Sequence, residues 1–506
     1  MKIGFLLQRR FAVIGQALAK ILNQEYGLTE FCGYVMGRDG YNFINQHNPL
    51  LAGRIYLDED IHNRYKSETI NWQFIKQFEK DYGLPNLWPY LEVDRIIRSS
   101  QLVRAFPHDT PRLSHLEMVK IFQATAKAIL EFFEKEKPDA MVISVAGSLG
   151  GLLLYEVARK KGVKTLVIHH TRISTRHLVS ENYYDFSFVN GLYGRLRSGE
   201  ASLPAERART VQYLEKLRQN PKPYREIDSA KFHQVNRRRQ FSFLNPKKIG
   251  WSIFWRLKMI ARFLTNPYRD DYTNINPFWE ICDNLKMKTR ALIGYGGLFD
   301  KINLNEDYAF YPLHREPEIA TLLLAPFYKD QLWLIKQIAR SLPLNFKLYV
   351  KEHPPMMGLR KRSFYRELKK IPNLVLVSPE VDGMALVNNA KLVYTISGTA
   401  GWEAVQLNKP VIAFSDVYYT KLPWVKKCRA IADLPNLTNE QLNNFKPDDS
   451  ALIDFLTAIF YESSPVDLTK IWWQESAKNV EKQTAELTPL ADLIAKKLNI
   501  SKHDIS

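Results

Sequence analysis

Short apolar runs alternate with segments of helical hydrophobic spacing in the first part of the chain. Near its start, KIGFLL is followed by AVIGQALAKILNQ and TEFCGYVMG, which predicts a strand, a helix and a second strand. Further on, DAMVISVAG, SLGGLLLYEVARKKG and VKTLVIHH repeat this order. A strand–helix–strand unit implies parallel pairing of its strands. We therefore expect residues 1–195 to form one Rossmann-like domain.

The same alternation returns after residue 306 and is sharper there. The apolar runs that predict strands, each next to a segment of helical spacing, are 346–350, 374–377, 392–396 and 411–414. This order is typical of a doubly wound parallel sheet. We predict an α/β protein with two such domains facing a central cleft, the second spanning residues 306–475. The tail, 476–506, is expected to be a helix that packs back across the domains.

The segment 196–305 differs from both domains, because it is polar, basic and helical. Its helix 249–264 carries aliphatic residues on one face, with tryptophans beside them and basic residues around them. The aliphatic residues are Ile253, Leu257, Ile260 and Leu264, and the aromatic residues beside them are Trp251, Phe254 and Trp255. The basic residues are Lys247, Lys248, Arg256, Lys258 and Arg262. Such a helix can lie on an anionic membrane. Ordinary packing on a domain, with a solvated basic rim, is the open alternative.

The charge of the chain changes the range of expected partners. Its 506 residues carry 71 Lys and Arg against 53 Asp and Glu, a formal net charge of +18. This excess favours anionic partners such as nucleic acid, anionic lipid, phosphorylated substrates or acidic polysaccharide. No nucleic-acid-binding motif accompanies the charge, so we expect no nucleic-acid partner.

The cysteines and the apolar runs bear on location. Cys32, Cys282 and Cys428 are far apart and form no CxxC pair, which argues against a disulfide framework or a zinc site. The opening MKIGFLLQRRF does not resemble a signal peptide, and no run of about 18 apolar residues occurs. We expect a cytoplasmic protein, with a peripheral position at the inner face of the cytoplasmic membrane left open.

The segment 394–414 is the most informative for chemistry. A buried strand ends in a turn of small residues, and a helix begins directly after it. Small residues let a ligand approach the backbone, and the N–H groups and dipole of the helix start favour an anion. We expect donor binding by Ser397, Gly398, Thr399 and Ala400, with Glu403 accepting two ribose hydroxyls. A tight turn with a capping threonine and an incidental glutamate is the alternative.

A second charged cluster follows the strand 346–350. Because the carboxyl ends of parallel strands line a ligand crevice, Lys351, Glu352 and His353 can face the same crevice as the turn after residue 396. Lys351 and His353 would neutralise phosphate oxygens, and Arg360 assists if its helix turns toward the crevice. The alternative is that Lys351 and Glu352 are solvated, with His353 capping the strand.

Other candidates follow predicted strands elsewhere. In YPLHREPE, His314, Arg315 and Glu318 can reach the donor crevice, although an ordinary loop explains them equally well. In the first domain, His169 and His170 follow TLVI, and either can bind the acceptor or act as its base. The further candidates are Arg172 for the acceptor, Asp39 for the base, and Ser148 as a helix cap that faces the acceptor. Structural histidines, a turn aspartate and a simple cap are the corresponding alternatives.

Four stretches together resemble one family. YPLHREPE, KLYVKEHP, RSFYRELKKIPNLVLVSP and ISGTAGWEAVQLNKPVIAF are similar to the capsular polysaccharide biosynthesis family of glycosyltransferases, and HHTRIST resembles a further segment of it. The similarity is dense over 306–420. It implies a GT-B fold with the nucleotide-sugar donor on the C-terminal domain and the acceptor mainly on the N-terminal one. It also implies that no metal and no other cofactor is required.

The resemblance also bears on the substrate. The His-Pro and Ser/Thr motifs are similar to the nucleotide-binding pair of bacterial sialyl- and Kdo-transferases, which carries over to His353, Ser397 and Thr399 and suggests a CMP-linked donor. Those sialyltransferases have an acidic pair before a glycine, where this chain has Arg38-Asp39-Gly40. The implied activity is sugar transfer to a surface or capsular polysaccharide or its lipid-linked acceptor. The alternatives are a non-catalytic polysaccharide- or lipid-binding component of capsule export, a polyol-phosphate transferase, and a nucleotide-sugar 2-epimerase.

Overall fold

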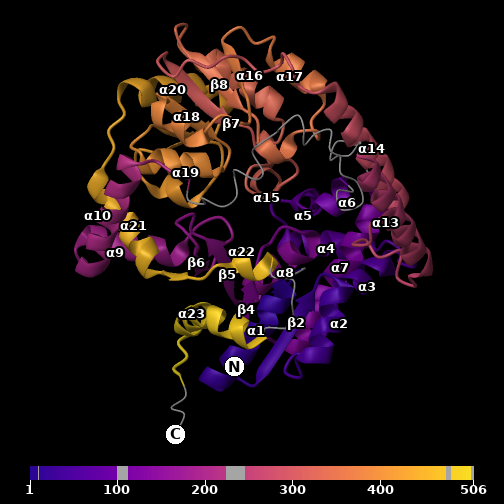
Figure 1. Cartoon of the computed structure of the whole chain (residues 1–506). Helices are drawn as coiled ribbons and strands as arrows, with labels where there is room; N and C mark the ends of the chain where they lie inside the picture. Colours follow the sequence, from indigo (N-terminus) through magenta and orange to yellow (C-terminus); the bar gives the residue numbers. More distant parts are fainter. Residues whose placement is uncertain (9–10, 100–111, 224–244, 474–479, 503–506) are drawn as a thin grey trace. The chain divides into compact units, whose positions relative to one another are not determined.

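The computed structural model describes residues 1–8, 11–99, 112–223, 245–473 and 480–502. The chain divides into two compact units (Figure 1). Met1–Arg98, Pro111–Arg207 and Asp454–Ser506 form the first, and Ala208–Ile453 belongs to the second. Each unit contains a sheet with helices on both faces, so the predicted fold class, an α/β protein with two Rossmann-like units, is confirmed.

The first unit is built on a seven-stranded sheet of order β13-β6-β5-β4-β1-β2-β3. The first five strands in the chain pair in parallel, whereas β6 and β13 are antiparallel to their neighbours. The strands are β1 (Lys2–Leu7), β2 (Glu30–Val35), β3 (Ile55–Leu57), β4 (Ala140–Ile143), β5 (Lys164–His170), β6 (Arg176–Ser180) and β13 (Ser463–Pro465). The strand order reverses between β1 and β4, which is where such sheets bind ligands.

Helices cover both faces of this sheet. On one face, α1 (Phe11–Tyr26) and α23 (Val480–Leu498) share a hydrophobic core with β1, β2 and β4. On the other, α8 (Leu149–Lys160) contacts β4, β5 and α7 (His115–Glu136), which begins with a capping box of Ser114 and Glu117. The remaining helices of the unit are α2 (Arg38–His47), α3 (Asp58–Asn63), α4 (Trp72–Tyr82), α5 (Trp88–Glu92), α6 (Arg95–Ser99), α9 (Ser187–Ser198) and α22 (Leu468–Trp473).

The second unit contains a six-stranded sheet of order β12-β11-β10-β7-β8-β9, parallel throughout. Its strands are β7 (Tyr308–Pro312), β8 (Lys347–Lys351), β9 (Leu374–Val377), β10 (Leu392–Thr395), β11 (Val411–Ala413) and β12 (Lys426–Lys427). The chain runs outward from β7 through β8 to β9, then returns to the other side of β7 with β10. The reversal point of this sheet therefore lies between β7 and β10.

Helices on both faces bury these strands, which explains their continuous apolar runs. One face packs against α16 (Gln331–Ser341), α17 (Arg362–Leu368) and α20 (Leu434–Asn443). On the other face lie α18 (Gly383–Asn389), whose Leu386 carbonyl accepts from the Tyr308 hydroxyl, and α19 (Thr399–Gln406). The unit also contains α13 (Pro246–Thr265), α14 (Pro277–Ile293) and α15 (Ile319–Leu322). The chain passes between the units within α10 (Pro204–Gln219) and α21 (Asp449–Tyr461).

One element differs from the expectation. His169 and His170 do not follow β5 but form its last two residues, where they pair with Leu178 and His177 of the antiparallel strand β6. The turn between β5 and β6 has left-handed backbone at Arg172 (φ 61°) and at a serine two residues later. Because no glycine or proline marks this turn, the sequence pattern did not reveal that the chain reverses there.

Candidate functional site

Candidate donor-binding residues gather at the carboxyl ends of β7, β8 and β10 in the second unit. His314 follows β7, Lys351 ends β8, and Ser397 follows β10. Because β7 and β10 are neighbours at the reversal point of the sheet, the loops that follow them diverge, and a crevice is expected there. The structure therefore brings together the two motifs that lie more than forty residues apart in the sequence.

The turn after β10 is held by Thr395 and His314. The Gly398 N–H donates to Thr395 Oγ1 at 2.8 Å, and the Ser397 N–H lies 3.5 Å from His314 Nε2. Because the Ser397 N–H donates to it, His314 Nε2 acts as an acceptor, and Thr395 Oγ1 lies 3.4 Å from the same nitrogen. The Ser397 hydroxyl donates to the carbonyl of Ala320 at 3.2 Å. The turn is thus fixed by four contacts before any ligand arrives.

These contacts reduce the number of backbone N–H groups in the turn that are available to bind an anion. The N–H groups of Ser397 and Gly398 face acceptors within the turn. Thr399 and Ala400 are the first two residues of α19, whose N–H groups have no acceptor in their own helix. We therefore expect any anion at this helix start to contact the backbone of Thr399 and Ala400, together with the nearby side chains.

Two glycines let α19 begin close to the sheet. A Cβ on Gly398 would lie 2.9 Å from Thr395 Oγ1 and 3.0 Å from His314 Nε2. A Cβ on Gly401 would lie 2.5 Å from the Tyr419 hydroxyl oxygen and 2.7 Å from Thr395 Cγ2. The Tyr419 hydroxyl itself donates to the Gly398 carbonyl at 2.9 Å. Side chains at these two positions would push the helix away from the strand, so the small residues are required by packing as well as by any ligand.

His314 is buried and neutral. Burial lowers the pKa of its imidazole to about 3, with the nearby His353 and Arg360 acting in the same direction. Its backbone N–H donates to Gln331 Oε1 at 2.7 Å, and its carbonyl accepts from Arg360 Nη2 at 2.6 Å. The ring therefore supports the turn after β10 rather than offering a positive charge to a phosphate.

Glu352 and Arg360, both predicted to bind the donor, belong to a buried ion-pair network. Arg360 Nε lies 3.1 Å from Glu352 Oε2, and Arg360 Nη1 lies 2.8 Å from Glu316 Oε2. Tyr365 donates its hydroxyl to Glu352 at 2.8 Å. Burial raises the pKa of Glu352, and Arg360 opposes this shift. With its side chain only 2% exposed, Arg360 holds the loop after β8 against the loop after β7.

Lys351 and His353 flank this network at the end of β8. Both side chains are half-buried. Burial lowers the pKa of Lys351, and the nearby carboxylates of Asp382 and Glu352 oppose this shift only in part. The His353 N–H donates to Glu352 Oε1 at 2.6 Å, and His353 precedes a short 3₁₀ turn formed by Pro354–Met356. Among the predicted donor residues of this loop, Lys351 is therefore a half-buried cation at the last position of the strand.

The other predicted donor residues lie around the same loops. Glu403 is half-buried in α19, and its carboxylate adds to the effect of burial in raising the pKa of Tyr213 and Tyr419. Arg315 and Glu318 are exposed on the loop after β7. Contact between Glu403 and a ribose stays a prediction, as does donor contact by Arg315 and Glu318.

In the first unit, Ser148 lies at the reversal point between β1 and β4. It is the N-cap of α8: its hydroxyl oxygen accepts from the Gly151 N–H at 3.2 Å. Gln8, directly after β1, donates its side-chain amide to Ser148 at 3.3 Å and to the Val145 carbonyl at 2.8 Å. Asp39 is exposed in the first turn of α2, after β2. Both therefore lie at the carboxyl edge of the first sheet.

The histidines of β5 are held by their neighbours. His169 donates from Nε2 to the Asn182 carbonyl at 2.7 Å, and burial lowers its pKa to about 4. His170 Nδ1 accepts from the Arg172 N–H at 2.8 Å, and its ring packs edge-on against His177. These contacts fix the orientation of both rings, whichever of them meets an acceptor.

Three residues that support the site were not singled out from the sequence. Thr395 ends β10, Glu316 pairs with Arg360, and Gln331 bonds to both His314 and Glu316. A buried polar residue requires a hydrogen-bond partner, so the last residue of an apolar strand, here Thr395, was a usable signal. Glu316 and Gln331 come from other segments, and no local spacing pattern marks them.

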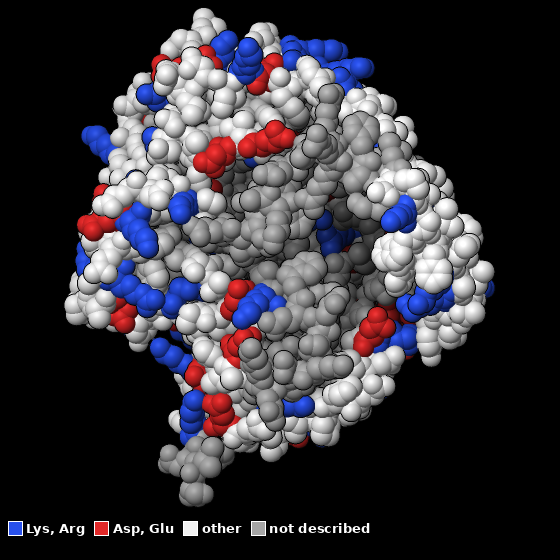
Figure 2. All heavy atoms as spheres, viewed as in Figure 1, with Lys and Arg blue, Asp and Glu red and all other residues white. Residues whose placement is uncertain are grey.

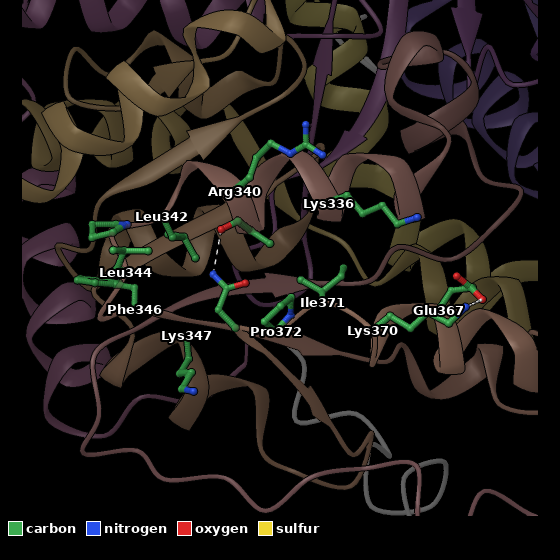
Figure 3. Close-up of a pocket in the computed structure, with 13 residues that line it drawn as sticks. Lys336, Arg340, Leu342, Leu344, Phe346, Lys347, Glu367, Lys370, Ile371 and Pro372 are labelled. Carbon is green, nitrogen blue, oxygen red and sulfur yellow. Dashed lines mark hydrogen bonds and ion pairs between the residues drawn. The ribbon is translucent and has the colours of Figure 1, made fainter.

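A surface pocket of about 680 Å³ lies at the opposite end of the second sheet (Figure 3). Lys336 and Arg340 of α16, Lys347 at the start of β8, and Ile371 before β9 line it. Lys347 and Lys351 mark the two ends of the same strand. Since parallel sheets bind ligands at their carboxyl ends, this pocket is not the expected donor site.

The described residues contain neither a metal-binding cluster nor a membrane-spanning helix. No group of three or more His, Cys, Asp or Glu side chains that could hold a metal ion occurs among them. In that same part of the chain, no helix is long and apolar enough to cross a membrane.

The arrangement defines an α/β protein with polar loops at the reversal point of a parallel sheet, as nucleotide-binding proteins have. Residues 325–423 match the family model described as capsule polysaccharide biosynthesis protein. The family predicted from the sequence is therefore confirmed for the segment that carries Lys351, His353 and the turn from Ser397. A search of curated protein sequences finds no match.

Two Kdo transferases and a UDP-GlcNAc 2-epimerase are among the solved structures that the chain matches at low identity. The chain resembles Thermosulfurimonas dismutans KpsC, beta Kdo 2,7 transferase, at 13% identity over 72% of this chain and 89% of that chain, with a TM-score of 0.37. The match to Thermosulfurimonas dismutans KpsC, beta Kdo 2,4 transferase, has 13% identity, covers 65% of this chain and 85% of that chain, and has a TM-score of 0.34. The match to Methanocaldococcus jannaschii UDP-GlcNAc 2-epimerase, in complex with UDP-GlcNAc and UDP, has 13% identity, covers 91% of this chain and 100% of that chain, and has a TM-score of 0.30.

Proposed function

We propose that the protein is a glycosyltransferase that moves a sugar from a nucleotide-sugar donor to a capsular or other surface polysaccharide, or to its lipid-linked acceptor. One observation carries the proposal: the loops after β7, β8 and β10 meet at the reversal point of a parallel sheet, within or next to the segment that matches the capsule family. Parallel sheets bind nucleotides at this position.

The donor would bind the second unit through its phosphates. Lys351 supplies a positive charge, the first N–H groups of α19 supply donors, and Thr399 supplies a hydroxyl. Ser397 would supply a second hydroxyl by exchanging the Ala320 carbonyl for a phosphate oxygen as its acceptor. In transfer, negative charge grows on the phosphate that leaves with the nucleotide. Preorganised donors and a cation around that oxygen lower the barrier without a metal ion or another cofactor. In this proposal His353 would contact the same phosphates, and Glu403 would accept the ribose hydroxyls.

The acceptor would bind the first unit, where a base removes the proton from its hydroxyl. A general base works best when its pKa lies near the working pH. His169, with a pKa lowered by burial to about 4, suits this role poorly at neutral pH, and His170 and Asp39 are the other candidates for the base. Arg172 and Ser148 are the proposed acceptor contacts. A cytoplasmic location would give the enzyme its nucleotide sugar, and the resemblance to Kdo- and sialyltransferases favours a CMP-linked one.

The test is nucleotide release from a panel of CMP-, UDP- and GDP-sugars, with and without capsular glycan or lipid-linked acceptor. We expect acceptor-dependent release from one donor, and a decrease of about tenfold or more in kcat/KM for Lys351→Gln, because a charge-assisted contact is lost. Lys347→Gln, at the other end of β8, is the matched control. Conversion of the sugar without acceptor would support the epimerase, and glycan binding without nucleotide turnover would support an export component.

A further inference from the structure

The helices α13 and α14 form a hairpin that buries little of its own apolar surface. None of the described side chains of α13 is buried, although the helix is 20 residues long. Several of its largest apolar residues are more than half exposed: Ile253 (52%), Phe254 (60%), Leu257 (62%) and Leu264 (57%). A helix gains most of its stability from packing an apolar face, and among the described residues this apolar surface stays largely exposed.

The exposed apolar residues lie on one side of α13. At 100° per residue, Ile249, Ile253, Phe254, Leu257 and Leu264 fall within one arc of the helix. Trp255, Met259 and Arg262 lie outside this arc and line a pocket of about 460 Å³ with Glu280 and Asn284 of α14. The helix therefore turns one side toward α14 and the apolar arc toward solvent.

Charge identifies the partner that fits this arc. Within α13 all five charged residues are basic and none is acidic: Lys247, Lys248, Arg256, Lys258 and Arg262. Figure 2 shows Lys and Arg side chains beside uncharged ones over this hairpin, at the right of the view. Trp251, which lines the pocket shared with α14, is still 67% exposed, and the Lys258 ammonium lies 5.1 Å from the centre of the Trp255 ring. An exposed apolar arc on a helix whose charged residues are all basic matches the boundary between acyl chains and anionic headgroups.

From these observations we propose that the hairpin of α13 and α14 docks the protein on an anionic lipid bilayer, with the arc from Ile249 to Leu264 inserted into the headgroup region. The apolar residues supply affinity for the acyl boundary, and the basic residues supply attraction to anionic headgroups. The helix lies in the plane of the surface and does not span the bilayer. This inference goes beyond the proposed transferase activity and does not depend on it.

The hairpin is attached to the loop that follows the candidate donor residues of β8. Near the end of α14, Arg290 donates from Nη1 to the carbonyls of Gly358 (3.1 Å) and Leu359 (2.6 Å). Just after α14, the Tyr295 hydroxyl accepts from the Gly358 N–H at 2.7 Å. Arg362 donates to the Gly294 carbonyl at 2.7 Å. A hairpin that docks on a membrane therefore holds the second unit there through direct hydrogen bonds.

The test is vesicle flotation of the full chain without any nucleotide. One set of vesicles contains phosphatidylglycerol and phosphatidylethanolamine, and the other contains phosphatidylcholine alone. We expect binding to the anionic set only, with weaker binding as salt is added. The double variant Ile253→Ser with Leu257→Ser should bind at least about tenfold more weakly, because two inserted side chains are removed. Leu344→Ser, at a fully exposed leucine outside the hairpin, should bind as wild type does.

Three outcomes would overturn the proposal. Wild type fails to float with anionic vesicles, or the double variant floats as well as wild type. In the third outcome, light scattering shows that wild type is a dimer and that the double variant is a monomer, so a second copy of the chain covers the arc. Because Ile253 and Leu257 are exposed, the variant should keep the wild-type melting temperature, which separates lost docking from lost folding. Because the flotation assay contains no nucleotide, a negative result would not bear on the transferase proposal, which is tested by nucleotide release.

Discussion

Replacing Arg360 with methionine should destabilise the second unit strongly and in a pH-dependent way. The guanidinium makes three short contacts, to Glu352, Glu316 and the His314 carbonyl. Methionine keeps much of the apolar volume but leaves two buried carboxylates without a cation. Breaking a buried ion pair in this way costs about 3 to 5 kcal/mol. For a unit of this size, that lowers the melting temperature by roughly 6 to 20 °C.

The loss should be larger near pH 8 than near pH 5.5. Burial already raises the pKa of Glu352, and removing Arg360 removes the main opposing effect. The folded variant then holds a proton that the unfolded chain releases above its ordinary carboxyl pKa of about 4.3. Stability therefore decreases as the pH rises from the unfolded pKa through the raised folded pKa.

The assay is differential scanning calorimetry of the full chain at both pH values. Arg340→Met, an exposed arginine of α16, is the matched control and should change stability by less than about 0.5 kcal/mol. Adding Glu316→Gln and Glu352→Gln to Arg360→Met should recover part of the loss, because no uncompensated charge remains. The reasoning is refuted if Arg360→Met melts within about 2 °C of wild type near pH 8, or if its deficit is the same at both pH values.

Two further predictions concern the same loops. Gly401→Ala should lower stability by about 1 to 3 kcal/mol, because the new Cβ would lie 2.5 Å from the Tyr419 hydroxyl oxygen. Gly383→Ala, where a Cβ meets nothing within 4 Å, should change it little, and equal effects in urea unfolding would refute the packing argument. The pKa of His314 is about 3 in the folded state against 6.5 for an unperturbed histidine, so the unfolded chain binds more protons between these values. Stability should therefore fall as the pH drops below 6.5, and His314→Asn should flatten the dependence of melting temperature on pH; an unchanged slope would contradict it.

The parallel strands could be predicted from the sequence because they are buried on both faces. The predicted strand 374–377 is β9, and the predicted strands 346–350 and 392–396 differ from β8 and β10 by a single residue at their ends. Strands buried in this way read as continuous apolar runs that end where polar loops begin. The same reasoning placed the loops after β8 and β10 at one edge of one sheet.

What could not be predicted depends on contacts between distant segments. Glu316 is the partner of Arg360, yet no spacing rule links two residues 44 positions apart. The antiparallel pairing of β5 with β6 was missed, because the turn between them uses left-handed backbone at Arg172 without a glycine. The exposure of α13 also had to come from the structure, since an amphipathic pattern is the same whether its apolar face is covered or open.

The central claim is that the carboxyl end of the second sheet binds the nucleotide of the donor, and calorimetric titration tests it most directly. CMP, CDP, UDP, GDP and ADP would be titrated into wild type, Lys351→Gln and Lys347→Gln. The account predicts that one nucleotide binds wild type and Lys347→Gln alike, and binds Lys351→Gln about tenfold or more weakly. If no nucleotide binds the folded protein, or if Lys347→Gln loses binding while Lys351→Gln keeps it, the claim is contradicted.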